Sequence, residues 1–217
     1  MVSSASLCVF WGCRALSGDL AFELSIRKVL DALGVELSDL KMQACCGEPV
    51  RSLSVKASCY MALRLLALAA QEGHNVLFTP CSKGYYMMKW SRGVLERSRE
   101  VREAVVKALS SEGLDPSSLA QPLSIIGLLH DLVGPERIAK ARERELGWPI
   151  AIHPGCYLLR SGEAVDVIEA LREIVHASGL EAPYYPGLVD CCGGTLDLTR
   201  PDAALTLAGS KLRAASE

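Results

Sequence analysis

Cys45-Cys46-Gly47 is the stretch on which the 217-residue chain is organised, because it recurs as Cys191-Cys192-Gly193. A single cysteine precedes each copy, Cys13 before the first and Cys156 before the second. Cys81 follows the first copy, and its distance from Cys46 equals the distance between Cys156 and Cys191. Seven of the nine cysteines therefore belong to one pattern that is used twice.

The single cysteines follow short apolar runs that we interpret as buried strands. These runs are Leu7 to Trp11 before Cys13, Val76 to Thr79 before Cys81, and Trp148 to Ile152 before Cys156. Residues 35–42 and 183–189 are predicted to lead as short strands into the two Cys-Cys pairs. Helices are predicted between the strands, over residues 19–33, 57–71, 94–109, 122–133, 138–145, 163–178 and 202–215. Apolar residues recur with helical spacing in 19–33, 94–109 and 163–178, whereas 57–71 is rich in alanine, leucine and methionine on nearly every face.

This alternation of strands and helices predicts an α/β fold made of two tandem related halves. We place the first half at residues 1–115 and the second at 116–217, with residues 113–121 as the linker. Each half is expected to be a small parallel sheet flanked by helices, and the second half is shortened because it lacks a final strand. In parallel sheets of this kind, ligands bind at the carboxyl ends of the strands, which is where Cys13, Cys81 and Cys156 fall.

Composition excludes several classes of protein. Half of the residues are apolar, 22% are charged and the net charge is −2, so the chain is neither disordered nor a basic nucleic-acid binder. The apolar stretch from Met61 to Ala70 contains Arg64 and is too short to span a membrane. Residues 1–11 lack the basic and apolar regions of a secretion signal, so we expect a cytoplasmic protein.

Cysteine use indicates metal or redox chemistry. An odd number of cysteines in a reducing compartment argues against a disulfide framework. Zinc sites commonly use Cys-x2-4-Cys pairs, whereas adjacent cysteines direct their side chains apart and suit a larger iron-sulfur cluster. Zinc remains the alternative. Cys8 and Cys59 fall outside the pattern and are interpreted as small buried hydrophobic residues.

Other candidates lie close to these cysteines. His153 precedes Cys156 by three residues and can donate a hydrogen bond or a proton, or simply be satisfied by the backbone of its turn. Lys83 is expected to be solvated rather than paired with the Cys81 thiolate. The residues from Tyr85 to Met88 are expected to pack in the core rather than to contact a substrate. His74, His130 and His176 are assigned no role.

The pattern resembles the cysteine-rich B subunit of heterodisulfide reductase, the CCG-domain family. A family motif contains one cysteine, then a Cys-Cys pair, then a closing Cys-x-x-Cys, and it occurs twice per chain. The similarity spans nearly the whole sequence. The matching stretches are Phe10-Trp11-Gly12-Cys13, Leu33-Gly34-Val35, Cys45-Cys46-Gly47, Pro80-Cys81 and His153-Pro154-Gly155-Cys156-Tyr157-Leu158-Leu159-Arg160.

The resemblance implies an oxidoreductase subunit that carries 4Fe-4S clusters of the noncubane kind, between which a disulfide substrate is reduced. It assigns the first cluster to Cys13, Cys45, Cys46 and Cys81, and the second to Cys156, Cys191 and Cys192. His153 is the candidate catalytic residue. Flavin-containing and ferredoxin-like subunits are the implied partners in electron transfer, with no nucleic acid and no membrane span.

Two departures from the family motif limit this assignment. Gly84 occupies the position of the last cysteine of the first motif, and both closing cysteines of the second motif are missing. Four thiolates still suffice for a cluster at the first site, whereas the second site has three. A single working site favours electron relay over complete disulfide reduction. The alternative is a non-catalytic scaffold subunit that binds zinc or no metal, and a metal-free thiol-disulfide oxidoreductase is the weakest interpretation because Cys-x-x-Cys is absent.

Overall fold

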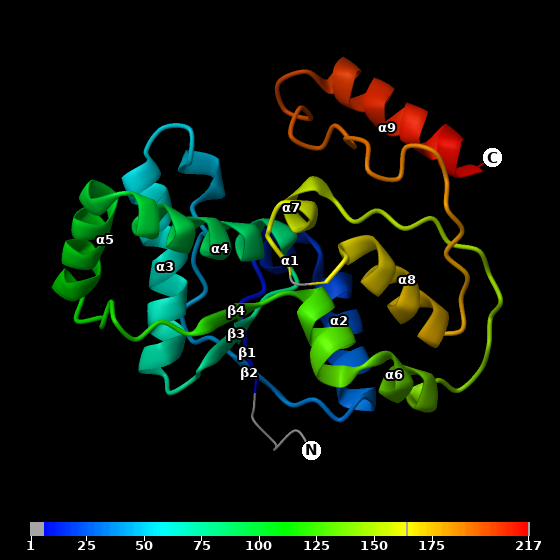
Figure 1. The fold of residues 1–217 in the computed structure, drawn as a ribbon, viewed down its shortest axis with the longest axis horizontal. Helices are drawn as coiled ribbons and strands as arrows, with labels where there is room; N and C mark the ends of the chain where they lie inside the picture. Colours follow the sequence, from blue (N-terminus) through cyan, green and yellow to red (C-terminus); the bar gives the residue numbers. More distant parts are fainter. Residues whose placement is uncertain (1–6, 164, 217) are drawn as a thin grey trace. The chain divides into compact units, whose positions relative to one another are not determined.

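The structure is a computed structural model that describes residues 7–163 and 165–216 (Figure 1). It separates into two compact units, and the boundary between them in the sequence falls between Leu132 and Val133. The division of the sequence repeat at residues 115 and 116 stays a prediction.

The first unit is built on a parallel sheet. Within the described residues its strands are β1 (Leu7–Val9), β2 (Leu37–Asp39), β3 (Val76–Phe78) and β4 (Gln121–Leu123), in the order β2-β1-β3-β4. Val9 pairs with Asp39 on one side and with Phe78 on the other. Because all the pairs are parallel, the loops that follow β1, β2 and β3 leave from the same edge. The predicted α/β class with a parallel sheet flanked by helices is confirmed.

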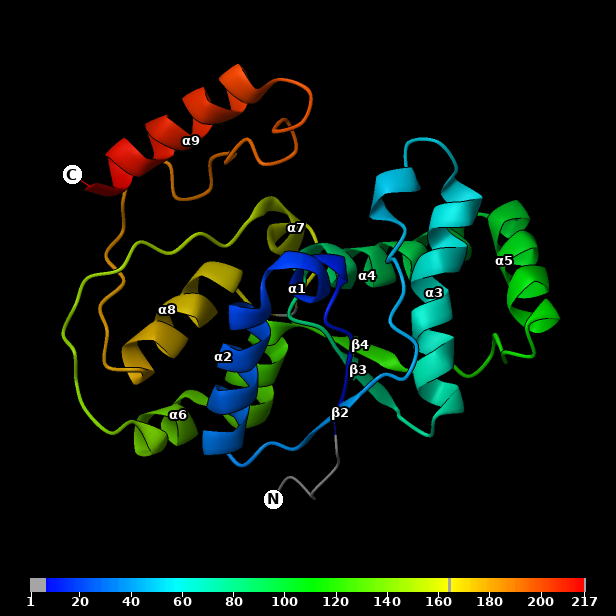
Figure 2. The same ribbon diagram turned by 180° about the vertical axis from the view of Figure 1, so that it is seen from behind.

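Helical crossovers cover the two sides of this sheet. In both views α2 lies on one side of the strands and α3 on the other (Figures 1 and 2). α3 packs in turn against α4 and α5. In chain order these crossovers contain α1 (Cys13–Gly18), α2 (Leu20–Ala32), η1 (Glu48–Val50), α3 (Val55–Gln71), α4 (Ser82–Arg97) and α5 (Arg99–Ser111).

α3 forms the centre of the core. Its sequence is rich in alanine and leucine, which favour helix, and the Ser54 hydroxyl caps its start by accepting a hydrogen bond from the Ala57 amide at 3.2 Å. Cys59 and Leu63 on this helix have no solvent exposure, and neither has Cys8 on β1. The expectations that α3 is buried and that Cys8 and Cys59 are core residues are therefore confirmed.

The second unit is mainly helical in its described residues. It contains α6 (Pro135–Ala141), α7 (Cys156–Leu159), α8 (Val167–Ala177) and α9 (Pro201–Ser216), and α6 packs against α8. A small core cluster forms around Ile152, Tyr185 and Leu188, with apolar side chains from α8 and α9 packed against it. None of its helices, and no other helix in the two described ranges, is long and apolar enough to cross a bilayer.

Several expected elements need correction. The single helix expected over residues 94–109 is divided, because α4 ends at Arg97 and α5 begins at Arg99. The strand expected over residues 148–152 is reduced to an isolated parallel bridge between Pro149 and Glu181. Residues 183–189 form no strand and are turns from residue 186 onward, because prolines at 183 and 186 cannot donate to a ladder. The helix expected over residues 122–133 starts later, as the π-helical segment η2 (Gly127–Val133). Pro122 lies instead in β4, where an edge strand tolerates proline.

Candidate metal centre

The first cysteine set lies at the carboxyl edge of the sheet. Cys13 begins α1 after β1, the Cys45-Cys46 pair follows β2, and Cys81 follows β3 as the residue that caps α4. Since these strands are parallel neighbours, their loops deliver the cysteines to one edge. Cys13 is exposed, and Cys45, Cys46 and Cys81 are half-buried.

Two observations bring these four thiols into one group. A Cβ on Gly12, next to Cys13, would lie 3.1 Å from the Cys81 Cβ and 3.4 Å from its Sγ. The pKa of Cys46 is raised to about 12, first by burial and further by the charges of Cys81, Cys45 and Cys13, while a hydrogen bond to the Glu48 backbone opposes the shift. Cys46 is therefore a protonated thiol at neutral pH, and a cation bound beside it would favour its thiolate form.

Backbone amides point at two of the sulfurs. The Gly47 amide donates to the Cys45 Sγ at 3.4 Å, and the Gly84 amide donates to the Cys81 Sγ at 3.4 Å. Cys81 also lies at the amino-terminal end of α4, as its N-cap residue.

Gly47 locks the Cys45-Cys46 turn onto α3. Its φ is +82°, and a Cβ at this position would lie 2.6 Å from the Ser58 carbonyl oxygen. The Ser58 hydroxyl in turn donates to the Gly47 carbonyl at 2.8 Å. Only glycine meets both demands, which accounts for the third residue of the Cys-Cys-Gly motif.

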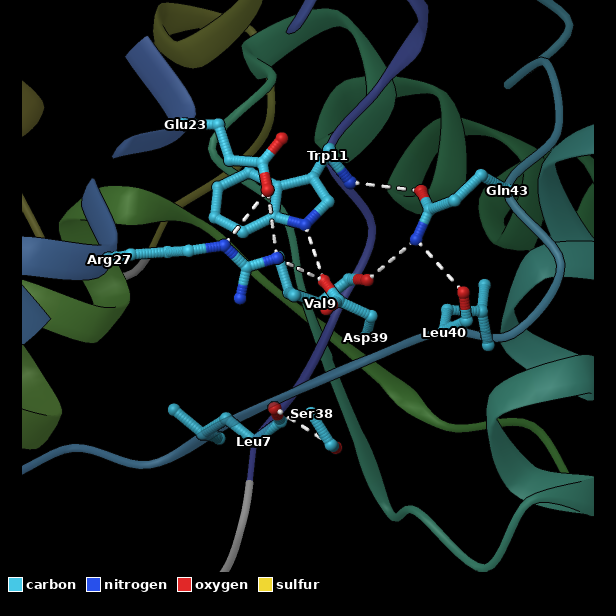
Figure 3. A network of polar contacts seen from close by, with 9 residues as sticks. All are labelled: Leu7, Val9, Trp11, Glu23, Arg27, Ser38, Asp39, Leu40 and Gln43. Atoms are coloured by element: carbon cyan, nitrogen blue, oxygen red, sulfur yellow. Dashed lines mark hydrogen bonds and ion pairs between the residues drawn. The ribbon is translucent and has the colours of Figure 1, made fainter. Parts of the chain in front are cut away.

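Gln43 joins the two loops that carry Cys13 and the Cys45-Cys46 pair (Figure 3). Its Oε1 accepts the Trp11 amide, and its Nε2 donates to the carbonyls of Val9 and Leu40, each at 3.1 Å. One side chain thus fixes the end of β1 to the segment after β2.

An ion-pair network supports the same loop from the side of α2 (Figure 3). The Trp11 indole donates to Asp39 at 2.7 Å, and Arg27 pairs with Asp39 at 2.6 Å and with Glu23 at 2.8 Å. The Arg27 guanidinium lies 4.7 Å from the Trp11 ring centroid. Trp11 is consequently held through its backbone, its indole nitrogen and its ring face.

The residues expected around Cys81 behave differently from one another. Lys83 keeps 45% of its side chain exposed, as expected for a solvated lysine, and it also lies 3.8 Å from the Glu48 carboxylate. Tyr85, Met87 and Met88 are buried, as expected for core packing.

The second cysteine set repeats the local geometry of the first. The Gly193 amide donates to the Cys191 Sγ at 3.4 Å, and Gly193 has a φ of +78°. A Cβ there would lie 2.8 Å from the Cα of Ala204 on α9. Cys156 begins α7 after Gly155, as Cys13 begins α1 after Gly12. All three thiols are exposed, and their convergence on one metal stays a prediction.

His153 lies in the loop before Cys156 and is exposed. Its pKa is lowered, first by partial desolvation of the ring and then by the charge of Lys211, while a hydrogen bond to the Leu188 backbone opposes the shift. The neutral imidazole therefore predominates at neutral pH, and its catalytic role stays a prediction.

One further group of potential ligands was not anticipated from the sequence. Ligand atoms of Cys8, Glu72 and His74 lie within 4.8 Å of one another. The pKa of Cys8 is raised to about 12, mainly by burial and then by the charges of Glu72 and Asp39, so Cys8 remains a protonated thiol. Its neighbours come from the end of α3 and the turn after it, without any short spacing to Cys8 that would reveal them.

Comparisons with known proteins agree with this arrangement. A family model described as a cysteine-rich domain, CCG, matches residues 7–89 and 150–217. A protein named as similar to the heterodisulfide reductase B subunit, from Archaeoglobus profundus, is 31% identical over 215 residues, which cover 94% of this chain and 72% of the relative. The B subunit of a ferredoxin/F(420)H(2)-dependent CoB-CoM heterodisulfide reductase from Methanosarcina acetivorans is 26% identical over 61% of this chain and 46% of the relative.

A solved structure supports the fold. The crystal structure of a hypothetical protein from Helicobacter pylori matches with a TM-score of 0.70 at 14% identity, covering 98% of this chain and 39% of that one. The two CCG matches coincide with the two copies of the Cys-Cys-Gly turn. This chain therefore belongs to the cysteine-rich CCG-domain family, together with proteins named as B subunits of heterodisulfide reductase.

Proposed function

We propose that the protein is a heterodisulfide reductase B-like iron-sulfur subunit that transfers electrons within a larger oxidoreductase complex. The observation that carries this proposal is the gathering of four thiols, from Cys13, Cys45, Cys46 and Cys81, at one edge of a parallel sheet. Family membership supports a redox role, because its relatives are named as reductase subunits.

The first cysteine set suits a 4Fe-4S cluster of the cubane or noncubane kind. Four thiolates are the usual ligand number for such a cluster, and N–H···S contacts like those from Gly47 and Gly84 tune its potential. Glycine at position 12 lets the backbone before Cys13 approach Cys81 closely. When bound, the cluster would supply one-electron transfer. Zinc is the competing occupant.

The protein's own residues would hold and insulate this centre. Gln43 and Trp11 fix the two ligand loops, and the pair between Lys83 and Glu48 spans the site. In the second unit Cys156, Cys191 and Cys192 would contribute ligands, and neutral His153, the candidate catalytic residue, would donate a hydrogen bond to sulfur. With three thiols there, electron relay to flavin-containing and ferredoxin-like partner subunits is the better-supported activity.

Metal analysis of protein purified without oxygen tests the proposal. We expect a brown protein with about four irons per chain and an electron paramagnetic resonance signal on oxidation or reduction. Cys45→Ser should abolish the colour, whereas Cys59→Ser, a matched change at a core cysteine, should retain it. A colourless protein that contains only zinc would contradict the proposal and favour the scaffold role.

A further inference from the structure

The two Cys-Cys-Gly turns are related by a constant offset in the sequence, which carries Cys45 to Cys191 and Gly47 to Gly193. Four backbone hydrogen bonds of the first turn recur in the second at this offset. For example, the Val50 amide bonds to the Gly47 carbonyl at 3.3 Å, and the Leu196 amide bonds to the Gly193 carbonyl at 2.8 Å. The offset aligns α9 with α3, so residues of the two helices can be compared position by position.

The hydrogen-bonding side chain that holds the first turn has no counterpart at the equivalent position of the second. Gln43, whose amide ties the Cys45-Cys46 loop to Val9, corresponds to Val189. Val189 is 55% exposed and has no polar side-chain atom. The second turn must therefore be held by another residue.

Lys211 on α9 supplies that support. It occupies the position of Leu65 in α3, yet it is buried, with only 8% exposure. Its Nζ donates to the carbonyls of Gly187, Leu188 and Asp190 at 2.6, 2.8 and 3.1 Å. All three ammonium donors are thus used on the segment that enters Cys191.

Lys211 is also connected, through Tyr185, to the loop before Cys156. The Lys211 Nζ lies 5.8 Å from the Tyr185 ring centroid, and the Tyr185 hydroxyl donates to the Ile152 carbonyl at 2.9 Å. Ile152 stands three residues before Gly155, as Val9 stands three before Gly12. The Tyr185 contact to Ile152 therefore parallels the Gln43 contact to Val9.

We propose that Lys211, assisted by Tyr185, is the positioning residue of the second cysteine set, replacing from α9 the function that Gln43 has in the first unit. The ammonium holds together the carbonyls of residues 187, 188 and 190, the last of which directly precedes Cys191 in the sequence. This inference rests on the proposed function only in treating these cysteines as ligands.

The test compares Lys211→Met, Lys211→Arg and the control Arg213→Met in reduced, metal-free full-length protein. Arg213 is exposed on the same helix and carries the same charge. Hydrogen exchange measures the order of residues 187–193, and iodoacetamide labelling read by peptide mass spectrometry measures the reactivity of each cysteine. Because both readouts precede metal binding, their result is independent of whether the first site holds iron.

Lys211→Met should speed amide exchange in residues 187–193 by about tenfold or more, since three carbonyls lose their donor. It should also change the labelling rates of Cys191 and Cys192 and leave that of Cys45 unchanged. Lys211→Arg should restore both readouts, and Arg213→Met should alter neither.

Unchanged exchange and labelling in Lys211→Met would overturn the inference. Equal losses in Lys211→Met and Lys211→Arg would also overturn it, because a side chain with the same charge and with N–H donors would then fail to hold these carbonyls. If Lys211→Met unfolds the second unit, Lys211→Arg alone decides: retained protection of residues 187–193 supports the role, and lost protection refutes it.

Discussion

Gly47 combines two constraints that the motif alone does not distinguish. Its φ of +82° is unfavourable for any residue with a Cβ, and its Cα faces the Ser58 carbonyl. Gly73 shares the first constraint, with a φ of +88°, but a Cβ there would meet nothing within 4 Å. This pair of glycines separates conformational strain from steric conflict.

We predict that Gly47→Ala destabilises the protein by about 3 kcal/mol, and that Gly73→Ala costs about 1 kcal/mol from the left-handed conformation alone. Urea denaturation of both variants measures the difference. Equal losses would show that the contact with Ser58 relaxes without cost.

The burial of Cys8 makes the free energy of unfolding decrease as the pH rises in the alkaline range. An unfolded cysteine has a pKa near 8.5, whereas burial raises the pKa of Cys8 in the folded protein to about 12. Between these values the unfolded state loses its proton while the folded state retains it, so the stabilisation present below about pH 8.5 is lost as pH rises.

Cys8→Ala should therefore reduce the fall in unfolding free energy between about pH 8 and pH 11 in reduced, metal-free protein. Cys13→Ala, at an exposed thiol, is the control. Lysines and tyrosines titrate equally in all three proteins, so the differences between the curves isolate Cys8. An unchanged slope in Cys8→Ala would contradict the prediction.

At the scale of elements, the helices were the part of the fold that the sequence predicted best. The helix over residues 19–33 is confirmed because its apolar residues recur with helical spacing, and the helix over 57–71 is confirmed because alanine, leucine and methionine favour helix. A glycine follows each closely. The strands were harder, since such short apolar segments carry little periodicity: β4 was hidden by Pro122, and residues 183–189 do not pair.

The same limit applies to the candidate site. The cysteines were recognisable from their spacing, whereas Gln43 bonds to Val9 and Lys211 bonds to Gly187, each far away along the chain. No local pattern distinguishes a glutamine or lysine that bonds to distant carbonyls from one on the surface. These supports emerge only once β1, β2 and α9 are placed in space.

Gln43 allows a test of how far the loop after β1 depends on its link to the segment after β2. Gln43→Ala removes three hydrogen bonds and should cost about 1–3 kcal/mol of stability, with faster iodoacetamide labelling of Cys13 and Cys45. Gln71→Ala, at an exposed glutamine, should be nearly neutral. If Gln43→Ala leaves labelling unchanged, the ion-pair network around Trp11 is sufficient to hold the loop.

At the scale of the whole molecule, the two units share a turn but differ in their thiols. Four cysteines gather in the first, and the second contains three. We predict that the double variant Cys191→Ser/Cys192→Ser retains the iron of the first site, at about four per chain, whereas Cys45→Ser/Cys46→Ser loses it. Iron analysis and visible absorption measure both. A loss of half the wild-type iron in the first variant would reveal a loaded second site.

The paired turns also bear on the order of events when the protein matures. Each turn is shaped by a left-handed glycine, an amide that points at sulfur and a helix packed beneath it, all of which belong to the polypeptide. In small zinc domains, by contrast, the metal drives folding. Here we expect the chain to fold first and to bind its cofactor afterwards at a preformed site. Removal of iron by a chelator should accordingly leave the far-ultraviolet circular dichroism spectrum unchanged and allow reloading without refolding.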